Sequence, residues 1–129
     1  MSLTALAISP SPNDELTWGD VYVYEKYIEY IPPQLTPNVL CNCIAYAKLL
    51  LGRTGETWGN AGKIVPNSTE PKIGSLILTN EGSNGHVGVV IGYTGETVTF
   101  EEANYFSCQR SVRTLPRDYT RIRGYKWFL

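Results

Sequence analysis

The most regular helical pattern in the chain spans residues 38–51, which read NVLCNCIAYAKLLL. Alanine, lysine and leucine are good helix formers, and Gly52 is placed to end the helix. Either Asn38 or Asn42 could cap its N-terminus, because an asparagine side chain accepts hydrogen bonds from the first free N–H groups. Both choices predict that Cys43 lies in or near the first turn.

The second half of the chain consists of short apolar and alternating runs that are typical of β-strands. Five strands are predicted, over residues 73–79, 86–93, 96–102, 110–115 and 121–128. A helix-bearing half followed by short antiparallel strands predicts an α+β fold.

Other segments have weaker patterns. Residues 1–16 are predicted to be an irregular lead-in, because most of this stretch is rich in Ser, Pro, Asn and Asp. Residues 17–31 alternate loosely and fit either a strand or a short helix. Residues 53–72 are rich in Gly and Pro and form a long connection with room for a short helix.

Length and composition limit the function. The 129 residues, 43% of them apolar, suit a single domain over 1–129. A net charge of -1 gives no electrostatic reason to expect nucleic acid as a partner. No apolar run reaches the roughly 20 residues that span a bilayer, and the N-terminus lacks the basic region of a signal peptide. We therefore expect no membrane partner, and synthesis in a cytoplasm.

The three cysteines are Cys41, Cys43 and Cys108. An odd number without a signal peptide argues against a disulfide framework, so at least one thiol is expected to be free. Cys41 points away from Cys43 on a helix and is interpreted as structural, and Cys108 as incidental. A Cys3His zinc site with His86 is disfavoured because Cys-x-Cys is a tight spacing for zinc. A redox pair of Cys41 and Cys43 is disfavoured because residues two apart on a helix diverge.

Cys43 and His86 are the candidate nucleophile and base. A helix N-terminus and a nearby imidazolium both favour the reactive thiolate, and His86 is the one histidine in the chain. A three-residue loop at residues 93–95 would place His86 opposite Glu102, within reach of a hydrogen bond. Strand parity then turns Glu102 inward and Glu101 outward.

The group that orients His86 is predicted to be Glu102 or Asn104, which lies beside it if the strand continues. The alternative for Glu102 is a structural ion pair with an arginine from residues 110–123. In that case the buried carboxylate would be satisfied without the imidazole.

Five segments follow one another along the chain: Cys43-Ile44-Ala45-Tyr46-Ala47, Thr57-Trp58-Gly59-Asn60-Ala61, Pro71-Lys72-Ile73-Gly74-Ser75, Gly85-His86-Val87-Gly88-Val89-Val90 and Glu102-Ala103-Asn104. In this order they resemble the CHAP family, the cysteine- and histidine-dependent amidohydrolases/peptidases of the papain-like NlpC/P60 superfamily. The best-matched region is 38–129.

The resemblance implies a papain-like fold in which the cysteine helix packs on an antiparallel sheet that carries the histidine. It implies Cys43 as nucleophile, His86 as base, Glu102 as the orienting group and Asn104 as a fourth member. The aromatic-Gly-Asn-Ala segment makes Trp58 and Asn60 the candidate walls of a substrate groove; these six residues are the predicted catalytic and binding set. No cofactor is needed.

Three positions depart from the family pattern. Ser75 stands where Asp is usual and offers no carboxylate. Asn42 precedes the cysteine where Gly or Gln is common, so an oxyanion role is expected of the Cys43 backbone N–H instead. Residues 31–37 contain no carboxylate, so no calcium and no other metal is expected.

The resemblance implies a peptidoglycan hydrolase that cuts the N-acetylmuramoyl-L-alanine amide or a peptide bond of the stem or bridge. The partner is a peptidoglycan peptide, joined by other virion proteins if the chain acts from a virion. A compact chain without a signal peptide suits a bacteriophage lysin that reaches the wall from a virion or at lysis. The alternatives are an inactive phage structural or wall-binding module, and an amidase of a peptide outside the cell wall.

Overall fold

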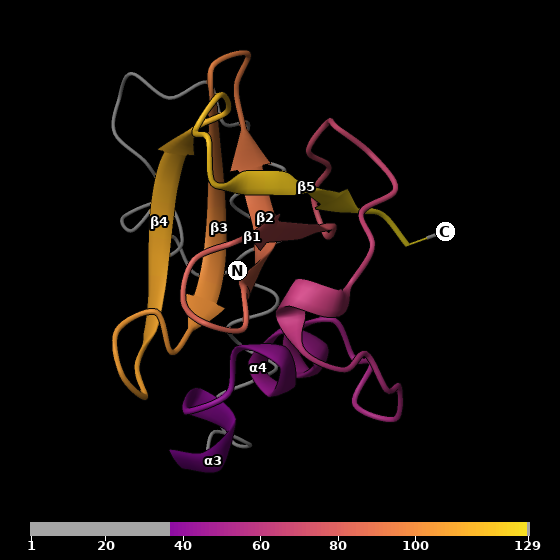
Figure 1. Cartoon of the computed structure of the whole chain (residues 1–129), viewed down its shortest axis with the longest axis vertical. Coiled ribbons are helices and arrows are strands. Elements are labelled where there is room, and N and C mark those ends of the chain that lie inside the picture. The colour runs from indigo at the N-terminus through magenta and orange to yellow at the C-terminus, as the bar shows by residue number, and fades with distance from the viewer. Residues whose placement is uncertain (1–36, 129) are drawn as a thin grey trace, which may run out of the picture.

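The computed structural model describes residues 37–128, so the lead-in predicted over 1–16 and the segment 17–31 lie outside the described residues. Within 37–128 the helices come first and the strands follow (Figure 1). The elements are α3 (Pro37–Leu40), α4 (Cys43–Leu50), η2 (Ala61–Lys63), β1 (Leu76–Thr79), β2 (His86–Tyr93), β3 (Thr97–Ala103), β4 (Arg110–Pro116) and β5 (Ile122–Lys126). The α+β class is confirmed.

The predicted helix over 38–51 is interrupted. It forms as α3 and α4, with a break at Cys41 and Asn42. Asn42 has an extended backbone (φ -143°, ψ 109°), and its side chain accepts from the N–H groups of Ile44 and Ala45, so Asn42 is the N-cap of α4. No helix among residues 37–128 is long and apolar enough to cross a membrane.

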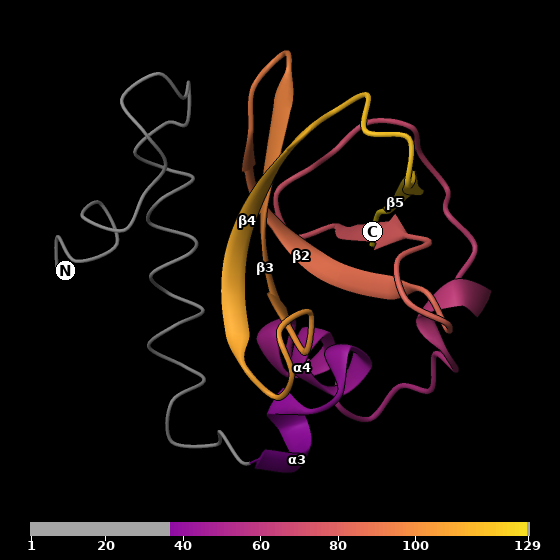
Figure 2. The same cartoon turned by 60° about the vertical axis from the view of Figure 1, so that its left-hand side comes forward.

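The five strands form one antiparallel sheet in the order β4-β3-β2-β1-β5. The sheet is strongly twisted: in Figure 1, β3 and β4 run along the long axis of the view while β1 and β5 run across it. Figure 2 shows the curvature of β2, β3 and β4, with α4 beside the start of β2 and the end of β3. This arrangement brings the N-terminus of the cysteine helix close to the end of the sheet at which β2 begins with His86.

The β2–β3 pairing differs from the predicted hairpin. Val90 opposes Phe100, whereas Gly92 opposes Thr99, so a bulge interrupts the ladder between them. The predicted pairing of Gly92 with Glu96 is therefore wrong. Continued toward the start of β2, the observed pairing sets Glu102 opposite Gly88, two positions from His86. A shift of two residues preserves strand parity, so His86 and Glu102 still share a face.

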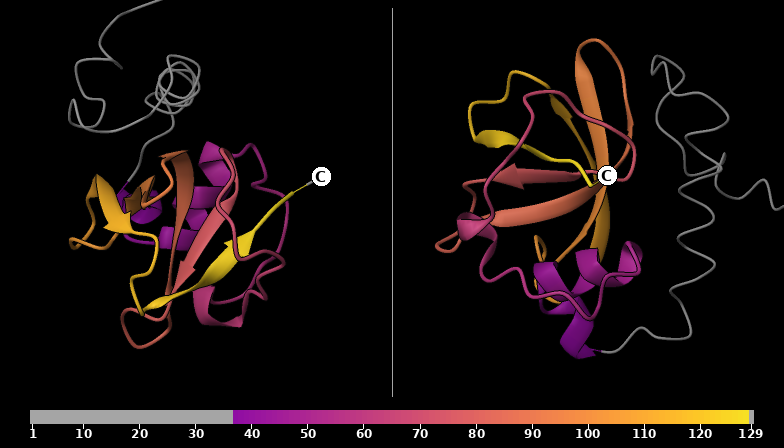
Figure 3. Two further views of the ribbon diagram at one scale, coloured as in Figure 1. Left: turned by 90° about the horizontal axis from the view of Figure 1, so that it is seen from above. Right: turned by 90° about the vertical axis from the view of Figure 1, so that its right-hand side faces the viewer.

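Both faces of the sheet carry a cluster of buried apolar residues. On one face α4 packs on a cluster that contains Leu76, Leu78, Val87, Val89 and Ala103. On the other face lie Ile77, Val90, Val98, Phe100 and Tyr125. Figure 3 shows from two further sides how α3 and α4 lie together beside the ends of β2 and β3.

Burial of both faces corrects the expectation for Glu101. Its side chain is predicted to point to solvent, but it is 1% exposed and accepts a hydrogen bond from the Tyr46 hydroxyl of α4. Burial and the adjacent carboxylate raise the pKa of the Tyr46 hydroxyl well above its ordinary value, which keeps it a donor. Alternation correctly separated Glu101 from Glu102, but it could not show that a helix covers the second face.

Candidate active site

The N-terminus of α4 positions Cys43. Because Asn42 occupies the cap, Cys43 is the first residue of the helix, where the helix dipole favours an anionic side chain. The Cys43 side chain is partly exposed. The thiol thus lies at a helix N-terminus with access from solvent.

A tightly packed loop positions His86. Gly85, which precedes it, has φ 77°, and a Cβ atom there would lie 2.7 Å from the backbone nitrogen of Gly62 in η2. The Gly62 N–H donates to the Asn84 carbonyl at 2.7 Å. Only glycine permits this approach at such a conformation, so η2 holds the loop that delivers His86 to the start of β2.

His86 lies between a carboxylate and the thiol. Its Nε2 atom is 2.7 Å from Oε1 of Glu102, and the Cys43 thiol lies close enough to raise the pKa of the ring. Because Glu102 occupies Nε2, Nδ1 is the nitrogen that remains for the thiol. The order thiol, imidazole, carboxylate is the one that nucleophilic hydrolases use.

The surroundings favour the charged form of the imidazole. Burial by itself lowers the pKa of His86, but hydrogen bonds to Cys43 and Glu102, together with the negative charges of those groups, outweigh burial. The result is a pKa raised from 6.5 to about 9. A protonated imidazole is therefore the favoured state of His86 near neutral pH.

Glu102 has partners besides His86. The side chain is 1% exposed and also accepts from Ser111 and Arg113 of β4. The sequence presented pairing with His86 and pairing with an arginine as alternatives, and the structure contains both. Arg113 and its second carboxylate partner, Glu81, were not among the predicted site residues. Arg113 lies on β4 and Glu81 lies in the loop after β1. No local sequence motif connects these two elements.

A cavity of about 430 Å³ opens onto Cys43 and His86. Its walls come from the α4 N-terminus, the segment before η2, the loop at residues 81–85 and the end of β3. They include Asn42, Asn60, Glu81, Ser83, Asn84, Asn104 and Tyr105. His86 is only 6% exposed, yet it forms part of this lining. A substrate carbonyl can therefore approach the thiol from the cavity.

The remaining predicted residues divide between two places. Asn60 and Asn104 line the cavity, whereas Trp58 lines a different pocket, beside Phe128. The Trp58 ring stacks on Phe128 with centroids 5.7 Å apart, and its Nε1 donates to Glu56. Trp58 is not among the residues that line the cavity at Cys43. The side-chain oxygen of Asn104 accepts from the Cys108 N–H at 2.8 Å, so it shapes the loop beside the cavity.

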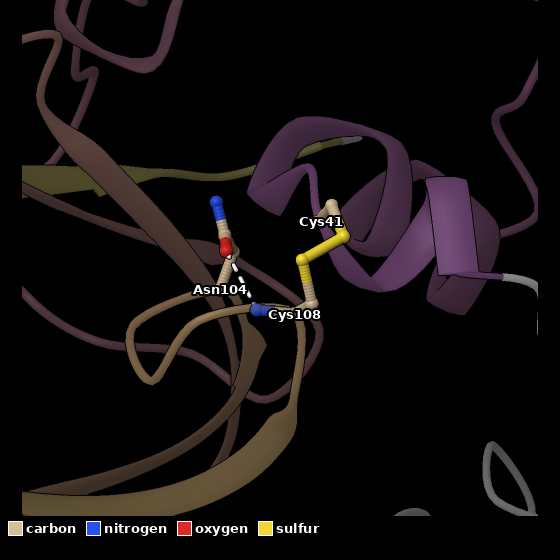
Figure 4. Close-up of a disulfide and its surroundings, with 3 residues drawn as sticks. All are labelled: Cys41, Asn104 and Cys108. Atoms are coloured by element: carbon tan, nitrogen blue, oxygen red, sulfur yellow. Dashed lines mark hydrogen bonds between the residues drawn. A yellow bond between two sulfur atoms is a disulfide. The ribbon is translucent and has the colours of Figure 1, made fainter.

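A disulfide corrects the interpretation of the cysteines. Cys41, in the turn before α4, is bonded to Cys108, in the loop between β3 and β4 (Figure 4). All three cysteines lie among the described residues, and Cys43 alone is free. The two bonded residues are 67 positions apart, and spacing gave no sign that the fold joins them. The disulfide connects two walls of the cavity.

No group of three or more His, Cys, Asp or Glu residues suited to a metal occurs within residues 37–128. Ser75, which replaces the usual carboxylate, is buried, and its hydroxyl donates to the Lys72 carbonyl at 2.6 Å. In this chain the position stabilises the turn before β1.

A thiol, an imidazole and a carboxylate joined in series beside a cavity are the features of a nucleophilic hydrolase site. The model of the CHAP domain family matches residues 34–104, and the chain belongs to that family. CHAP domains are in general hydrolytic amidases or peptidases that act on peptidoglycan. A comparison with curated proteins gives no match.

Proposed function

We propose that the chain hydrolyses an amide bond of peptidoglycan with Cys43 as the nucleophile, His86 as general base and acid, and Glu102 as the group that orients His86. The observation that carries the proposal is the continuous chain of contacts from the thiol through the imidazole to a buried carboxylate. The position of the cysteine helix ahead of the sheet that bears the histidine supports a papain-like arrangement.

The reaction follows from the protonation states. The Cys43 thiolate attacks the scissile carbonyl. During this attack His86 is an imidazolium, which keeps its proton available for the leaving amine. The imidazolium then protonates the departing amine, and a thioester forms on Cys43. The neutral imidazole next removes a proton from water, which attacks the thioester and releases the acid. No cofactor takes part in these steps.

Charge that develops on the carbonyl oxygen needs a donor. The side-chain oxygen of Asn42 is committed to capping Ile44 and Ala45. The backbone N–H of Cys43 is therefore the proposed oxyanion donor, as its place at a helix N-terminus suggests.

The cavity suits a peptide. Several amide side chains line it, which can donate and accept hydrogen bonds along a peptide backbone; they are Asn42, Asn60, Asn84 and Asn104. The Cys41–Cys108 disulfide supports action outside a reducing cytoplasm, as a lysin would require.

The test is the mass of the fragments that the protein releases from purified sacculi. An amidase would release stem peptides with a free N-terminal L-alanine, and an endopeptidase would release peptides cut within the stem or bridge. Either result supports the proposal if Cys43→Ala releases nothing and retains the wild-type melting behaviour. A Cys41→Ser/Cys108→Ser variant is the matched control, because it loses the other two sulfurs and keeps Cys43. Equal release by Cys43→Ala and the wild type would overturn the proposal.

A further inference from the structure

Both oxygens of the Glu102 carboxylate are held by partners outside its own strand. Oε1 contacts His86 at 2.7 Å and Arg113 Nη2 at 3.0 Å. Oε2 accepts from Arg113 Nε at 2.6 Å and from the Ser111 hydroxyl at 3.0 Å. A guanidinium that binds two oxygens of one carboxylate through two N–H groups fixes the plane of that carboxylate.

Arg113 is itself held in place. Its Nη1 and Nη2 atoms donate to the Glu81 carboxylate at 3.1 and 2.8 Å. The guanidinium lies 3.5 Å from the ring centre of Tyr105 and 5.1 Å from that of Phe100. Its side chain is 13% exposed. The arginine is therefore a nearly buried cation whose donors are shared between two carboxylates.

Arg113 is the cation that both carboxylates of this cluster share: it forms ion pairs with Glu81 and with Glu102. Burial alone would raise the pKa of the Glu81 carboxyl, but hydrogen bonds from Arg113 and Thr79 hold that pKa below its ordinary value. Arg113 thus places one guanidinium between two nearly buried carboxylates.

We propose that Arg113 is a positioning residue of the active site: its two-pronged contact fixes the Glu102 carboxylate so that one oxygen meets Nε2 of His86. The proposal rests on the proposed function, because it assigns Arg113 a role in the same Cys43–His86 chemistry. Arg113 lies beyond the segment 34–104 that the family model matches. It acts through Glu102 and contacts neither Cys43 nor His86 in the described structure.

Arg113 is needed because a glutamate side chain has several rotatable bonds, so its carboxylate takes one orientation only when its partners fix it. Without Arg113, Glu102 would keep the contacts to Ser111 and His86, but it would lose the two N–H donors that fix the plane of its carboxylate. Misplacement of the groups that orient a catalytic base by about 1 Å is enough to cost on the order of 100-fold in rate. Lysine would retain the charge but lose the planar fork.

The kinetic test is a double-mutant cycle on kcat. Arg113→Lys and Arg113→Gln should each lower kcat by roughly 10- to 100-fold and change KM little. In the Glu102→Gln background the same substitutions should have almost no further effect, because their target is already gone. Arg117→Gln is the matched control: Arg117 follows β4 and is ion-paired with Glu70, away from the cavity. Equal losses in both backgrounds would overturn the positioning role.

A second measurement needs no substrate. His86 is the only histidine of the chain, so its imidazole signals in NMR spectra need no assignment. The wild type and Arg117→Gln should show a low-field proton resonance from the Nε2–H donated to Glu102, and Arg113→Gln should lose or broaden it. An unchanged resonance in Arg113→Gln would overturn the proposal. If Arg113→Gln does not fold, Arg113→Lys serves in its place. A failure of the proposed function would instead appear as no hydrolysis by a wild-type protein that shows this resonance.

Discussion

The imidazole of His86 and the carboxylate of Glu102 meet at 2.7 Å although the two residues do not oppose each other in the β2–β3 ladder. The residue opposite Glu102 is Gly88, and the contact to His86 is diagonal. Long side chains can bridge such a diagonal. Gly88 contributes no side chain of its own, and the Phe100 ring occupies the space above it. The contact between His86 and Glu102 therefore runs past a position that has no side chain.

The close packing around Gly88 predicts that Gly88→Ala destabilises the fold. A Cβ atom at this position would lie 2.5 Å from the Phe100 ring and 3.1 Å from the Glu101 carbonyl oxygen. Phe100 is fully buried, so the ring has little room to move. We expect a loss of about 1–3 kcal/mol in the free energy of unfolding, measured by urea denaturation. Gly95→Ala is the control, since nothing lies within 4 Å of a Cβ atom there.

The pH dependence of activity should report the imidazolium of His86. With a pKa raised to about 9, the imidazole is protonated at neutral pH and loses its proton as the pH rises through that value. The leaving amine then has no proton donor, so kcat/KM should fall above pH of about 9. The measurement is initial rates of fragment release across the alkaline range. A fall centred near the ordinary histidine pKa would contradict the assignment.

Glu102→Gln should shift that profile. The carboxylate raises the pKa of His86, so its removal should move the alkaline fall of kcat/KM to lower pH. Loss of the orienting group should also lower kcat by about 100-fold. Glu102→Asp keeps the charge and is expected to preserve more of the alkaline limb than Glu102→Gln. Identical profiles for the wild type and Glu102→Gln would rule out the orienting role.

The disulfide should contribute to stability through the length of the loop that it closes. Cys41 and Cys108 are separated by 67 positions, and closing a loop of this size stabilises a fold by about 2–4 kcal/mol. Cys41→Ser/Cys108→Ser should lose this amount in denaturant titrations. Mild reductant should give a similar loss in the wild type and none in the double variant. Equal stability of the oxidised and reduced wild type would show that the bond adds nothing.

Local sequence patterns predicted much of the secondary structure and the pairing of His86 with Glu102. The run 86–93 and the cap at Asn42 are as expected, because alternation and capping are set by near neighbours. The pairing of His86 with Glu102 also held, since side-chain parity survives a register shift of two residues. The papain-like assignment and the roles of all six predicted site residues stay predictions.

Interactions between distant segments lay beyond that reasoning. The sequence by itself determined the α+β class, the helix-start position of Cys43 and the face shared by His86 and Glu102, because these follow from local periodicity, from capping and from the parity of two strands joined by a short hairpin. Only the tertiary structure decided that Cys41 joins Cys108, that α4 buries Glu101 and that Arg113 binds both Glu81 and Glu102. Those contacts arise when a twisted sheet and a helix close on each other, and no local periodicity encodes the distance between their surfaces.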